Sequence, residues 1–307
     1  MKKITVVIPN FNGIQYVERC LDSLKRQTFS EFNVIFVDNG SVDGSRELTE
    51  EKYPWVRVIA LAENTGFCKA VNIGIEATQT PYVVLLNNDT EAEPDFLLEL
   101  YRGIEKKKNA FSAAARMLQF HDRGKIDDAG NYYNCLGWAF ALGKGKPEEK
   151  YKKERKIFAS CGGAAIYRTE LVKQLGGFDE DFFMYAEEEE LSWRIKKRGE
   201  KIYNIPQAKI IHLEGATLEK QHDFNEKQFT FRINGTMTYF WKRYGREGIY
   251  QFYKFRALRY QRLKKIAEIQ KKSDVSFQFE TRLRCLLECF EKIMEKTEGE
   301  GKKNGRS

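Results

Sequence analysis

The chain has 307 residues, of which 42% are hydrophobic and 31% charged, and its formal net charge is +8. This composition supplies enough apolar material for a sizeable core and excludes wholesale disorder. No apolar run approaches the roughly 20 residues that a membrane-spanning helix needs, and the N-terminal stretch is too short for a signal peptide. We therefore expect a cytoplasmic protein of one or two domains.

Strand and helix patterns alternate along the first third of the chain. Buried apolar runs predict strands over 4–9, 32–37, 56–61 and 81–86. Helical spacing of apolar residues predicts helices over 14–27, 45–52, 66–77 and 94–107. This alternation predicts an α/β fold of Rossmann type, with a mainly parallel sheet, right-handed crossovers and helices on both faces.

The pattern is less regular in the middle of the chain. The charged segment 144–156 is expected to be a mobile loop, and 158–166 reads as a strand rich in small residues. A helix follows a run of four glutamates and has Leu191 and Ile195 on its apolar face. A short strand over 209–211 then precedes His212.

Polar, turn-prone residues follow three of the predicted strands. These clusters are Pro9-Asn10-Phe11-Asn12, Asp38-Asn39-Gly40-Ser41 and Asn87-Asn88-Asp89-Thr90. Ligands of such sheets bind at the carboxyl ends of the strands, where these clusters converge. The chain contains no G-x-G-x-x-G after its first strand and no P-loop, which counts against a dinucleotide site and a P-loop nucleotidase. A nucleotide would therefore be held by side chains.

The motifs occur in the order and spacing of a known family. Together with Asn64-Thr65-Gly66-Phe67, the run 177–185 and the run 187–194, they resemble the inverting family 2 glycosyltransferases of GT-A fold. The resemblance is closest to the rhamnosyltransferase-like branch and extends from residue 4 to about residue 215. It implies transfer of a sugar from a nucleoside diphosphate to an acceptor hydroxyl, with inversion.

The resemblance assigns a nucleotide site to the edge of the sheet. Asp38 resembles the family aspartate that accepts a hydrogen bond from the base ring, although capping of a turn or helix is an alternative role. The other residues expected to contact the nucleotide are Pro9, Asn10, Asn12, Asn39, Ser41, Gly66 and Asn88.

A divalent cation, Mn²⁺ or Mg²⁺, is also implied. Asp89 matches the last residue of the family's metal-binding motif, and His212 resembles the histidine that completes the site. The cation would bridge the diphosphate and neutralise the leaving group. This motif reads Asn87-Asn88-Asp89, so it offers a single carboxylate. The alternatives are a solvated helix start for Asp89 and a polar surface position for His212.

Glu188 occupies the position of the family's catalytic base, and Glu187 is its rival. The base must take a proton from the attacking hydroxyl. Alternatively, glutamates at a helix start are favoured by the helix dipole alone. Gly163 and Ala164 resemble small residues that let the sugar and the acceptor approach, and Trp193 is either a stacking surface for the acceptor or a packed helix residue.

The C-terminal third carries most of the positive charge. From Lys242 to Lys272, eleven Lys or Arg stand against two glutamates, with aromatic residues between them. This segment is either an interfacial helix on the inner face of an anionic membrane or a solvated helix packed through its aromatic face. Nucleic acid is not the expected partner. We expect a GT-A domain over 1–235, a basic amphipathic helical extension over 236–298 and a disordered tail over 299–307.

The combined prediction is an inverting, metal-dependent glycosyltransferase of bacterial cell-surface polysaccharide synthesis. The expected donor is a TDP- or UDP-linked sugar, with rhamnose as the favoured sugar, and the expected acceptor is a glycan or a lipid-linked oligosaccharide. One alternative is a scaffold of the same fold that binds sugar nucleotides or membrane without catalysis. The other is a nucleotidyltransferase, which would need a basic, glycine-rich loop after the first strand.

Overall fold

The computed structural model describes residues 1–133, 139–213 and 224–303, which fall into two units. The first unit holds Met1–Tyr133, Ala139–Glu180 and the described residues from Glu188 to Leu213. The second holds Asp181–Glu187 and the described residues from Phe224 onward. The chain thus leaves the first unit just before Asp181 and returns to it at Glu188.

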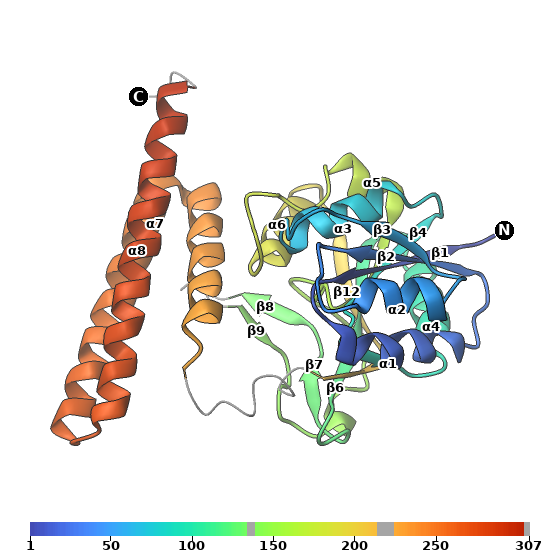
Figure 1. The fold of residues 1–307 in the computed structure, drawn as a ribbon, viewed down its shortest axis with the longest axis horizontal. Helices are drawn as coiled ribbons and strands as arrows, with labels where there is room; N and C mark the ends of the chain where they lie inside the picture. The colour runs from blue at the N-terminus through green and yellow to red at the C-terminus, as the bar shows by residue number, and fades with distance from the viewer. Residues whose placement is uncertain (134–138, 214–223, 304–307) are drawn as a thin grey trace. The chain divides into compact units, whose positions relative to one another are not determined.

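The first unit is built on one mixed sheet (Figure 1). Its strands are β1 (Ile4–Asn10), β2 (Phe32–Asp38), β3 (Arg57–Ala60), β4 (Tyr82–Leu86), β5 (Thr90–Ala92), β6 (Ala110–Gln119), β7 (Ile126–Asp128), β10 (Arg155–Lys156), β11 (Ala164–Arg168) and β12 (Lys201–His212). The main path runs β10-β12-β6-β11-β4-β1-β2-β3, while β5 pairs with β12 and β7 with β6. Strands β8 (Asn131–Tyr133) and β9 (Ala139–Ala141) form a separate pair.

Four strands form the parallel half, in the order β3-β2-β1-β4. The helices of this unit are α1 (Ile14–Lys25), α2 (Ser45–Lys52), α3 (Phe67–Glu76), α4 (Phe96–Glu105), the 3₁₀ helix η1 (Glu148–Tyr151), α5 (Thr169–Gln174) and α6 (Glu187–Lys197). Every residue of β4 is buried, as expected of a strand covered on both faces. The predicted α/β fold with a mainly parallel sheet is confirmed.

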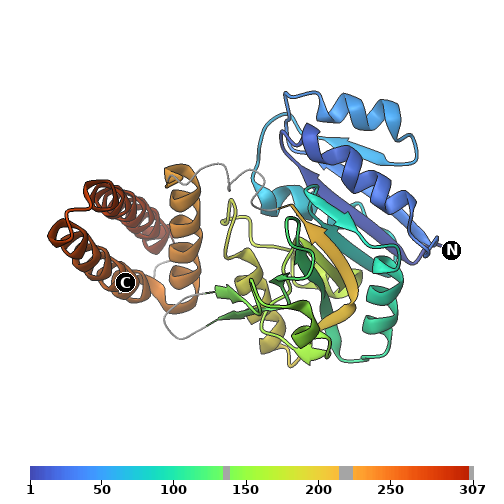
Figure 2. The same cartoon turned by 90° about the horizontal axis from the view of Figure 1, so that it is seen from below.

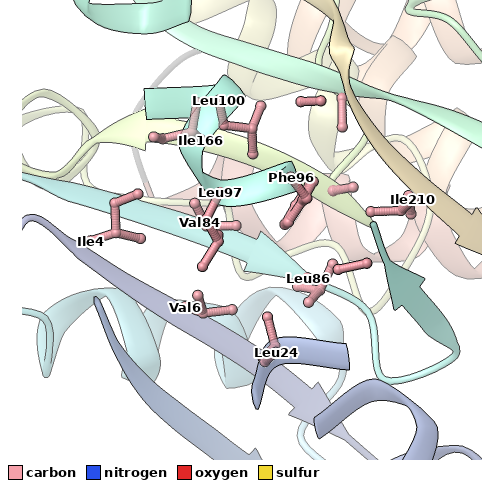
Figure 3. Close-up of a cluster of buried hydrophobic side chains, with 14 of the residues drawn as sticks. Ile4, Val6, Leu24, Val84, Leu86, Phe96, Leu97, Leu100, Ile166 and Ile210 are labelled. Carbon is pink, nitrogen blue, oxygen red and sulfur yellow. The ribbon is translucent and has the colours of Figure 1, made fainter. Parts of the chain in front are cut away.

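The core explains why the apolar runs predicted these strands. On one face, Val6 and Val84 pack with Leu24 of α1 and Leu97 of α4 (Figure 3). On the other face α3 packs against the sheet so closely that a Cβ at Gly74 would lie 2.3 Å from a methyl of Val7. Both faces of β1 and β4 are therefore filled by side chains, and the carboxyl ends of these strands are held in fixed positions.

The other half of the sheet differs from the prediction. Strand β11 runs antiparallel between β4 and β6. It starts at Ala164, later than predicted. Strand β12 starts at Lys201, well before the predicted 209–211, and its pairing with β6 is irregular between Ile205 and Lys209. Pro206 lies in that irregular stretch, where its missing N–H costs no ladder bond. The segment 144–156, expected to be a mobile loop, contains η1 and β10.

The second unit contains two long helical elements, α7 (Glu226–Ile269) and α8 (Ser273–Lys303) (Figures 1 and 2). Asn225 caps α7: its Oδ1 accepts a hydrogen bond from the Gln228 N–H at 2.9 Å. Gly245 interrupts α7 with φ 68° and ψ −163°, a conformation essentially restricted to glycine. Ile233 before the break, Phe252 after it and Leu286 of α8 share one apolar cluster.

The structure bears on the predictions made for the C-terminal region. Several aromatic residues of the basic segment pack inside the second unit, as Phe252 does against Phe240 and Tyr253 against Phe290. Helix α8 continues to Lys303 and residues 304–307 lie outside the described residues, so the disordered tail over 299–307 stays a prediction. The predicted domain boundary at residue 235 stays a prediction. No helix in the described part of the chain is long and apolar enough to cross a membrane.

Candidate active site

Asn10, at the end of β1, is the centre of a buried hydrogen-bond cluster. Its Nδ2 donates to Asp38 Oδ1 at 3.2 Å and to Ser41 Oγ at 3.0 Å, and lies 2.8 Å from Ser45 Oγ. Asp38 is opposite Asn10 in the β1–β2 register, and its Oδ2 accepts a bond from the Ser41 N–H at 3.2 Å. Asp38 therefore performs the turn-capping role, and its contact with a base ring stays a prediction.

Asn39 ties the end of β2 to the loop before α3. Its Nδ2 donates to Asn64 Oδ1 and to the Gly66 carbonyl, both at 3.0 Å, and its Oδ1 accepts from the Thr65 N–H at 2.9 Å. A Cβ at Gly40, which has φ 76°, would lie 2.7 Å from the backbone of Glu63. The predicted nucleotide residues Asn39 and Gly66 are thus brought together in one rigid loop pair.

The loop after β1 joins the same cluster. The Asn12 N–H donates to Ser41 Oγ at 3.0 Å, and Asn12 Oδ1 accepts from the Val42 N–H at 2.9 Å. Asn88 Nδ2 donates to Asn10 Oδ1 at 2.6 Å, so the loop after β4 is attached as well. Pro9 lies in β1, opposite Val37. The eight predicted nucleotide residues therefore line the carboxyl edge of β1, β2 and β4.

The candidate metal ligands lie at the next part of this edge. His212 ends β12, opposite Thr90 of β5, and its Nε2 is 3.5 Å from Asp89 Oδ1. His212 Nδ1 is 2.8 Å from Asp127 Oδ2, and Lys144 Nζ is 3.0 Å from Asp127 Oδ1. Burial by itself would lower the pKa of His212, but the neighbouring carboxylates of Asp127 and Asp89 raise that pKa to about 10.

Asp89 and His212 fit a divalent cation in part. Asp89 Oδ1 is buried, and its separation of 3.5 Å from His212 Nε2 is too long for a good hydrogen bond, so this oxygen is available to a ligand. Asp127 engages Nδ1 of His212, so Nε2 is the ring nitrogen turned toward Asp89, as in carboxylate–histidine–metal arrangements. Among the described residues no group of three or more His, Cys, Asp or Glu side chains could hold a metal ion. Further donors would have to come from a diphosphate.

Glu188, in the first turn of α6, reaches back to the loop before β11. Its Oε1 accepts a bond from the Gly162 N–H at 2.9 Å. The next residue in that loop, Gly163, accepts from the Asn87 N–H at 3.0 Å. The bonds through Asn87 and Gly163 therefore link the Glu188 carboxylate to the loop that carries Asp89.

The four glutamates at the start of α6 are not equivalent. Glu187, Glu189 and Glu190 are buried, whereas Glu188 is partly exposed. Glu190 is paired with Arg194, which also donates to the carbonyls of Leu175 and Gly177. Glu188 therefore keeps part of its surface exposed while its carboxylate is held in place, and Glu187 belongs by its contacts to the second unit.

Carboxyl groups near Glu188 have raised pKa values. Burial raises the pKa of Glu188, and burial together with the charge of Glu188 raises that of Glu189 to about 8. Burial, with the charges of Asp127 and Glu188, also raises the pKa of Asp128 to about 7. A carboxylate with a raised pKa is a stronger base than an ordinary one, which suits proton abstraction.

Gly163, Ala164 and Trp193 are the residues predicted to lie near the sugar or the acceptor. A Cβ at Gly163 would lie 3.1 Å from Asn87 Nδ2, so a glycine permits this close approach. Ala164 is buried in β11, opposite Leu86. Trp193 is partly exposed on α6, with Lys197 Nζ 3.7 Å from its ring centre. Stacking of an acceptor on Trp193 stays a prediction.

Sequence reasoning missed Asp127, Asp128 and Gly13. Asp127 is 85 positions from His212, and nothing in the sequence indicates that its side chain reaches the His212 ring at the end of β12. A Cβ at Gly13 would lie 2.1 Å from Asn88 Nδ2 and 2.5 Å from Asn10 Oδ1. Only its position within the turn after the first strand could have drawn attention to Gly13.

Comparison with known proteins places these features in a family. A family model described as glycosyl transferase family 2 matches residues 5–176. N-acetylglucosaminyl-diphospho-decaprenol L-rhamnosyltransferase of Mycobacterium tuberculosis is 27% identical over 234 residues, which cover 68% of this chain and 75% of that protein. Teichoic acid poly(glycerol phosphate) polymerase of Staphylococcus epidermidis is 38% identical over 95 residues, which cover 30% of this chain and 13% of the polymerase.

Solved structures agree on the fold. GalNAc-T7 with UDP, GalNAc and Mn²⁺ matches with a TM-score of 0.62 at 17% identity, over 77% of this chain and 47% of that chain. S. aureus TarS 1–349 in complex with UDP matches with a TM-score of 0.54 at 17% identity, over 81% of this chain and 70% of that chain. These likenesses establish a GT-A fold with C-terminal helices. Since the family model matches more than half of the sequence, the chain belongs to glycosyl transferase family 2.

Proposed function

We propose that this protein transfers a sugar from a nucleoside diphosphate to a hydroxyl of a growing glycan or lipid-linked oligosaccharide, with inversion at the anomeric carbon. The observation that carries the proposal is the position of Glu188. Among the four glutamates at the start of α6, Glu188 is the residue that is not fully buried, and the Gly162 N–H fixes its carboxylate next to a loop bonded to the Asn87-Asn88-Asp89 segment. A base and a diphosphate site on one sheet edge are what in-line sugar transfer requires.

The chemistry of the step follows from that arrangement. Glu188 takes the proton of the acceptor hydroxyl as its oxygen attacks the anomeric carbon. The bond between that carbon and the diphosphate oxygen breaks, and its electron pair leaves on the diphosphate. Because attack and departure occur on opposite sides of the carbon, the configuration inverts. Glu188 ends the step protonated and returns its proton to solvent.

Asp38, Asn10 and Ser41 would orient the nucleoside, and Asp89 with His212 Nε2 would hold Mn²⁺ or Mg²⁺ against the diphosphate. The cation would supply charge stabilisation to the leaving group. The buried Oδ1 of Asp89, which lies 3.5 Å from His212 Nε2 and makes no good hydrogen bond, supports this role. Asp127 would keep His212 in the orientation that directs Nε2 toward Asp89.

The donor and the setting are inferred from relatives. UDP is present in the TarS and GalNAc-T7 structures, and Mn²⁺ in that of GalNAc-T7. A rhamnosyltransferase acting on a diphospho-decaprenol and a teichoic acid polymerase are named among the sequence relatives. We therefore propose a TDP- or UDP-linked donor, with rhamnose as the first sugar to test, and a cytoplasmic role in cell-surface polysaccharide synthesis.

The base assignment is tested with a pair of matched variants. Glu188→Gln keeps an oxygen that can accept the Gly162 N–H but cannot take a proton, and Glu187→Gln changes the neighbouring glutamate in the same way. We expect Glu188→Gln to lower release of nucleoside diphosphate by roughly 10²–10⁴-fold, with donor binding unchanged and Glu187→Gln nearly active. The reverse ranking would assign the base to Glu187, and full activity of both would remove this cluster from the chemistry.

Donor class is tested by thermal shift with TDP, UDP, GDP and CDP, each with Mn²⁺, Mg²⁺ or chelator. A ligand that binds the folded state raises the melting temperature by mass action. We expect a metal-dependent shift with TDP or UDP. If no nucleotide shifts the protein and no sugar nucleotide is turned over, the non-catalytic scaffold becomes the better description.

A further inference from the structure

The half of α7 after Gly245 exposes an apolar stripe. Its inward face supplies Ile249, Phe252 and Tyr260 to the apolar cluster of the helical unit. Its outward face carries Phe255, Leu258, Arg262, Ile266 and Ile269, which recur every three or four residues and therefore share one side of the helix. Leu258 is 58% exposed and Ile269 is 74% exposed, so these large side chains lie open to solvent.

The stripe continues onto the turn that joins α7 to α8. Phe277, near the start of α8, is 69% exposed, and Val275 is also exposed. Large apolar side chains gathered on one surface, unlike scattered single ones, indicate an interaction site. We define the hairpin tip as Ile266, Ile269, Val275 and Phe277 together with the lysines of the turn, Lys271 and Lys272.

Positive charge surrounds this stripe. Residues 248–267 contain six Lys or Arg and no Asp or Glu. Within the described chain, Lys254, Arg262, Lys265, Lys271 and Lys272 make no ion pair, and all five are exposed. Long cationic side chains of this kind can cover apolar surface with their stems while their charged ends reach outward.

The turn between α7 and α8 has a lysine at a position where glycine is usual. Lys272 N–H donates to the Ala267 carbonyl at 2.9 Å and Lys271 N–H to the Glu268 carbonyl at 3.0 Å, the pattern of a Schellman motif. Its left-handed position, with φ 56°, is occupied by Lys271. Glycine is the usual residue there, because other residues are strained in this conformation. The chain thus keeps an ammonium group at the tip where glycine would be more stable.

We propose that the hairpin tip and the outward stripe of α7 dock on an anionic lipid bilayer, with the apolar side chains in the interface and the lysines and arginines at the lipid phosphates. A mixture of exposed aliphatic and basic residues is the signature of an interfacial helix. A second copy of the chain fits less well, since two-fold pairing about Arg262 would set the same cations against one another. The surface is argued from its own residues and does not depend on the donor site.

The test is co-sedimentation of the full chain with vesicles of phosphatidylcholine alone or of equal parts phosphatidylcholine and phosphatidylglycerol. We expect binding to the anionic vesicles, weakened by high salt. Replacing Lys265, Lys271 and Lys272 by Gln should weaken this binding on the order of a hundredfold, at about fivefold for each lysine. The matched control replaces Lys106, Lys108 and Lys152 of the first unit by Gln, and should bind like the parent.

A second variant tests the apolar part separately. Ile269→Ser combined with Phe277→Ser should reduce binding by roughly tenfold or more, because it removes apolar area from the interface. Since all these positions are exposed, circular dichroism should show an unchanged fold. Equal binding to both vesicle types, or equal loss in the lysine variant and its control, would overturn the proposal. So would a salt-stable dimer, measured by light scattering, that the serine variant converts to monomer.

Discussion

Asp127 holds the His212 ring through Nδ1 and so determines which nitrogen is turned toward Asp89. Outer carboxylates of this kind orient a ligating imidazole and raise its basicity, and their loss typically costs 10–100-fold in metal affinity. We expect Asp127→Asn to weaken Mn²⁺ binding by about that factor, with little change in nucleotide binding without metal. Titration of Mn²⁺ in the presence of UDP measures the effect directly.

The control for this variant is Asp122→Asn. Asp122 is exposed and is paired with Lys125 at 2.8 Å, away from the imidazole. The Asp122→Asn substitution removes the same charge from a nearby loop, so it should leave the affinity for Mn²⁺ unchanged. Equal affinities for Asp127→Asn and the parent protein would mean that His212 either binds no cation or is oriented without help from Asp127.

Asp128 makes folding stability depend on pH. Burial raises its pKa to about 7 in the folded chain, against about 4 for an exposed Asp. Between these values the folded state keeps a proton that the unfolded state has released, so stability falls as pH rises through this window. Asp128→Asn removes this effect and retains an oxygen for the Gly130 N–H. Relative to the parent protein, the variant should gain up to about 4 kcal/mol between acid and pH above about 8.

Thermal unfolding of both proteins across this range is the measurement. Glu189, whose pKa burial raises to about 8, acts in the same direction and remains in the variant. The slope should therefore become smaller in Asp128→Asn without disappearing. Parallel stability curves for the two proteins would show that Asp128 is ionised in the folded state at neutral pH.

At the scale of elements, α7 fits closely against the segment that leads to the candidate base. A Cβ at Gly235 would lie 2.1 Å from the carbonyl oxygen of Tyr185. Tyr185 has φ 70°, and its hydroxyl accepts a bond from Gln228 Nε2 at 3.2 Å. Phe183 stacks on Phe231 at a ring distance of 5.2 Å. The first half of α7 therefore fixes a strained backbone immediately before Glu187.

Gly235→Ala should displace this segment. Overpacking of a tight contact typically costs about 1–3 kcal/mol, and a shift of about 1 Å at a catalytic group can cost 10²-fold in rate. We expect lower turnover with unchanged donor affinity, together with a reduced melting temperature. Gly124→Ala is the control, since its Cβ would meet Asp122 Oδ1 at an ordinary 3.4 Å. Normal turnover in Gly235→Ala would show that this close approach does not position the base.

How much could be predicted differs between the two halves of the sheet. Strands such as β1 and β4 are short, continuous apolar runs, so the sequence pattern alone identifies them. Only the end of strand β12 was predicted, because Pro206 and the irregular pairing around it divide the sequence pattern into two weak pieces. The position of β11 depends on contacts with β4 and β6 that are distant in sequence.

The candidate site shows the same division. Asn10, Asp38 and Asn88 were identifiable because each follows a recognisable strand, and parallel pairing brings strand ends together. Asp127 was not identifiable because its role depends on a contact across 85 positions with His212. Local patterns therefore predict the nucleotide edge, while the support of the metal ligands requires the fold.

At the scale of the whole molecule, the helical unit contains more than the C-terminal helices. Asp181–Glu187 belongs to it by contacts, although this segment lies between two parts of the first unit in sequence. Asp181 bonds to Lys242 of α7 and, at 2.8 Å, to Lys296 of α8. The segment is thus held from both helices, and the chain re-enters the first unit at Glu188.

This connection predicts the effect of removing the helices. A chain ending at residue 224 retains every residue of the nucleotide edge but loses the partners of the segment before the base. It should keep a nucleotide-induced thermal shift while turnover falls by about a hundredfold, since the segment that leads to the base loses the contacts that hold it and a shift of about 1 Å at a catalytic group can cost that much. A chain ending at residue 303 should behave like the full protein. If the shorter chain binds nucleotide and turns over donor at the full rate, α7 and α8 are not needed for catalysis. Their proposed binding to lipid would then be their main role.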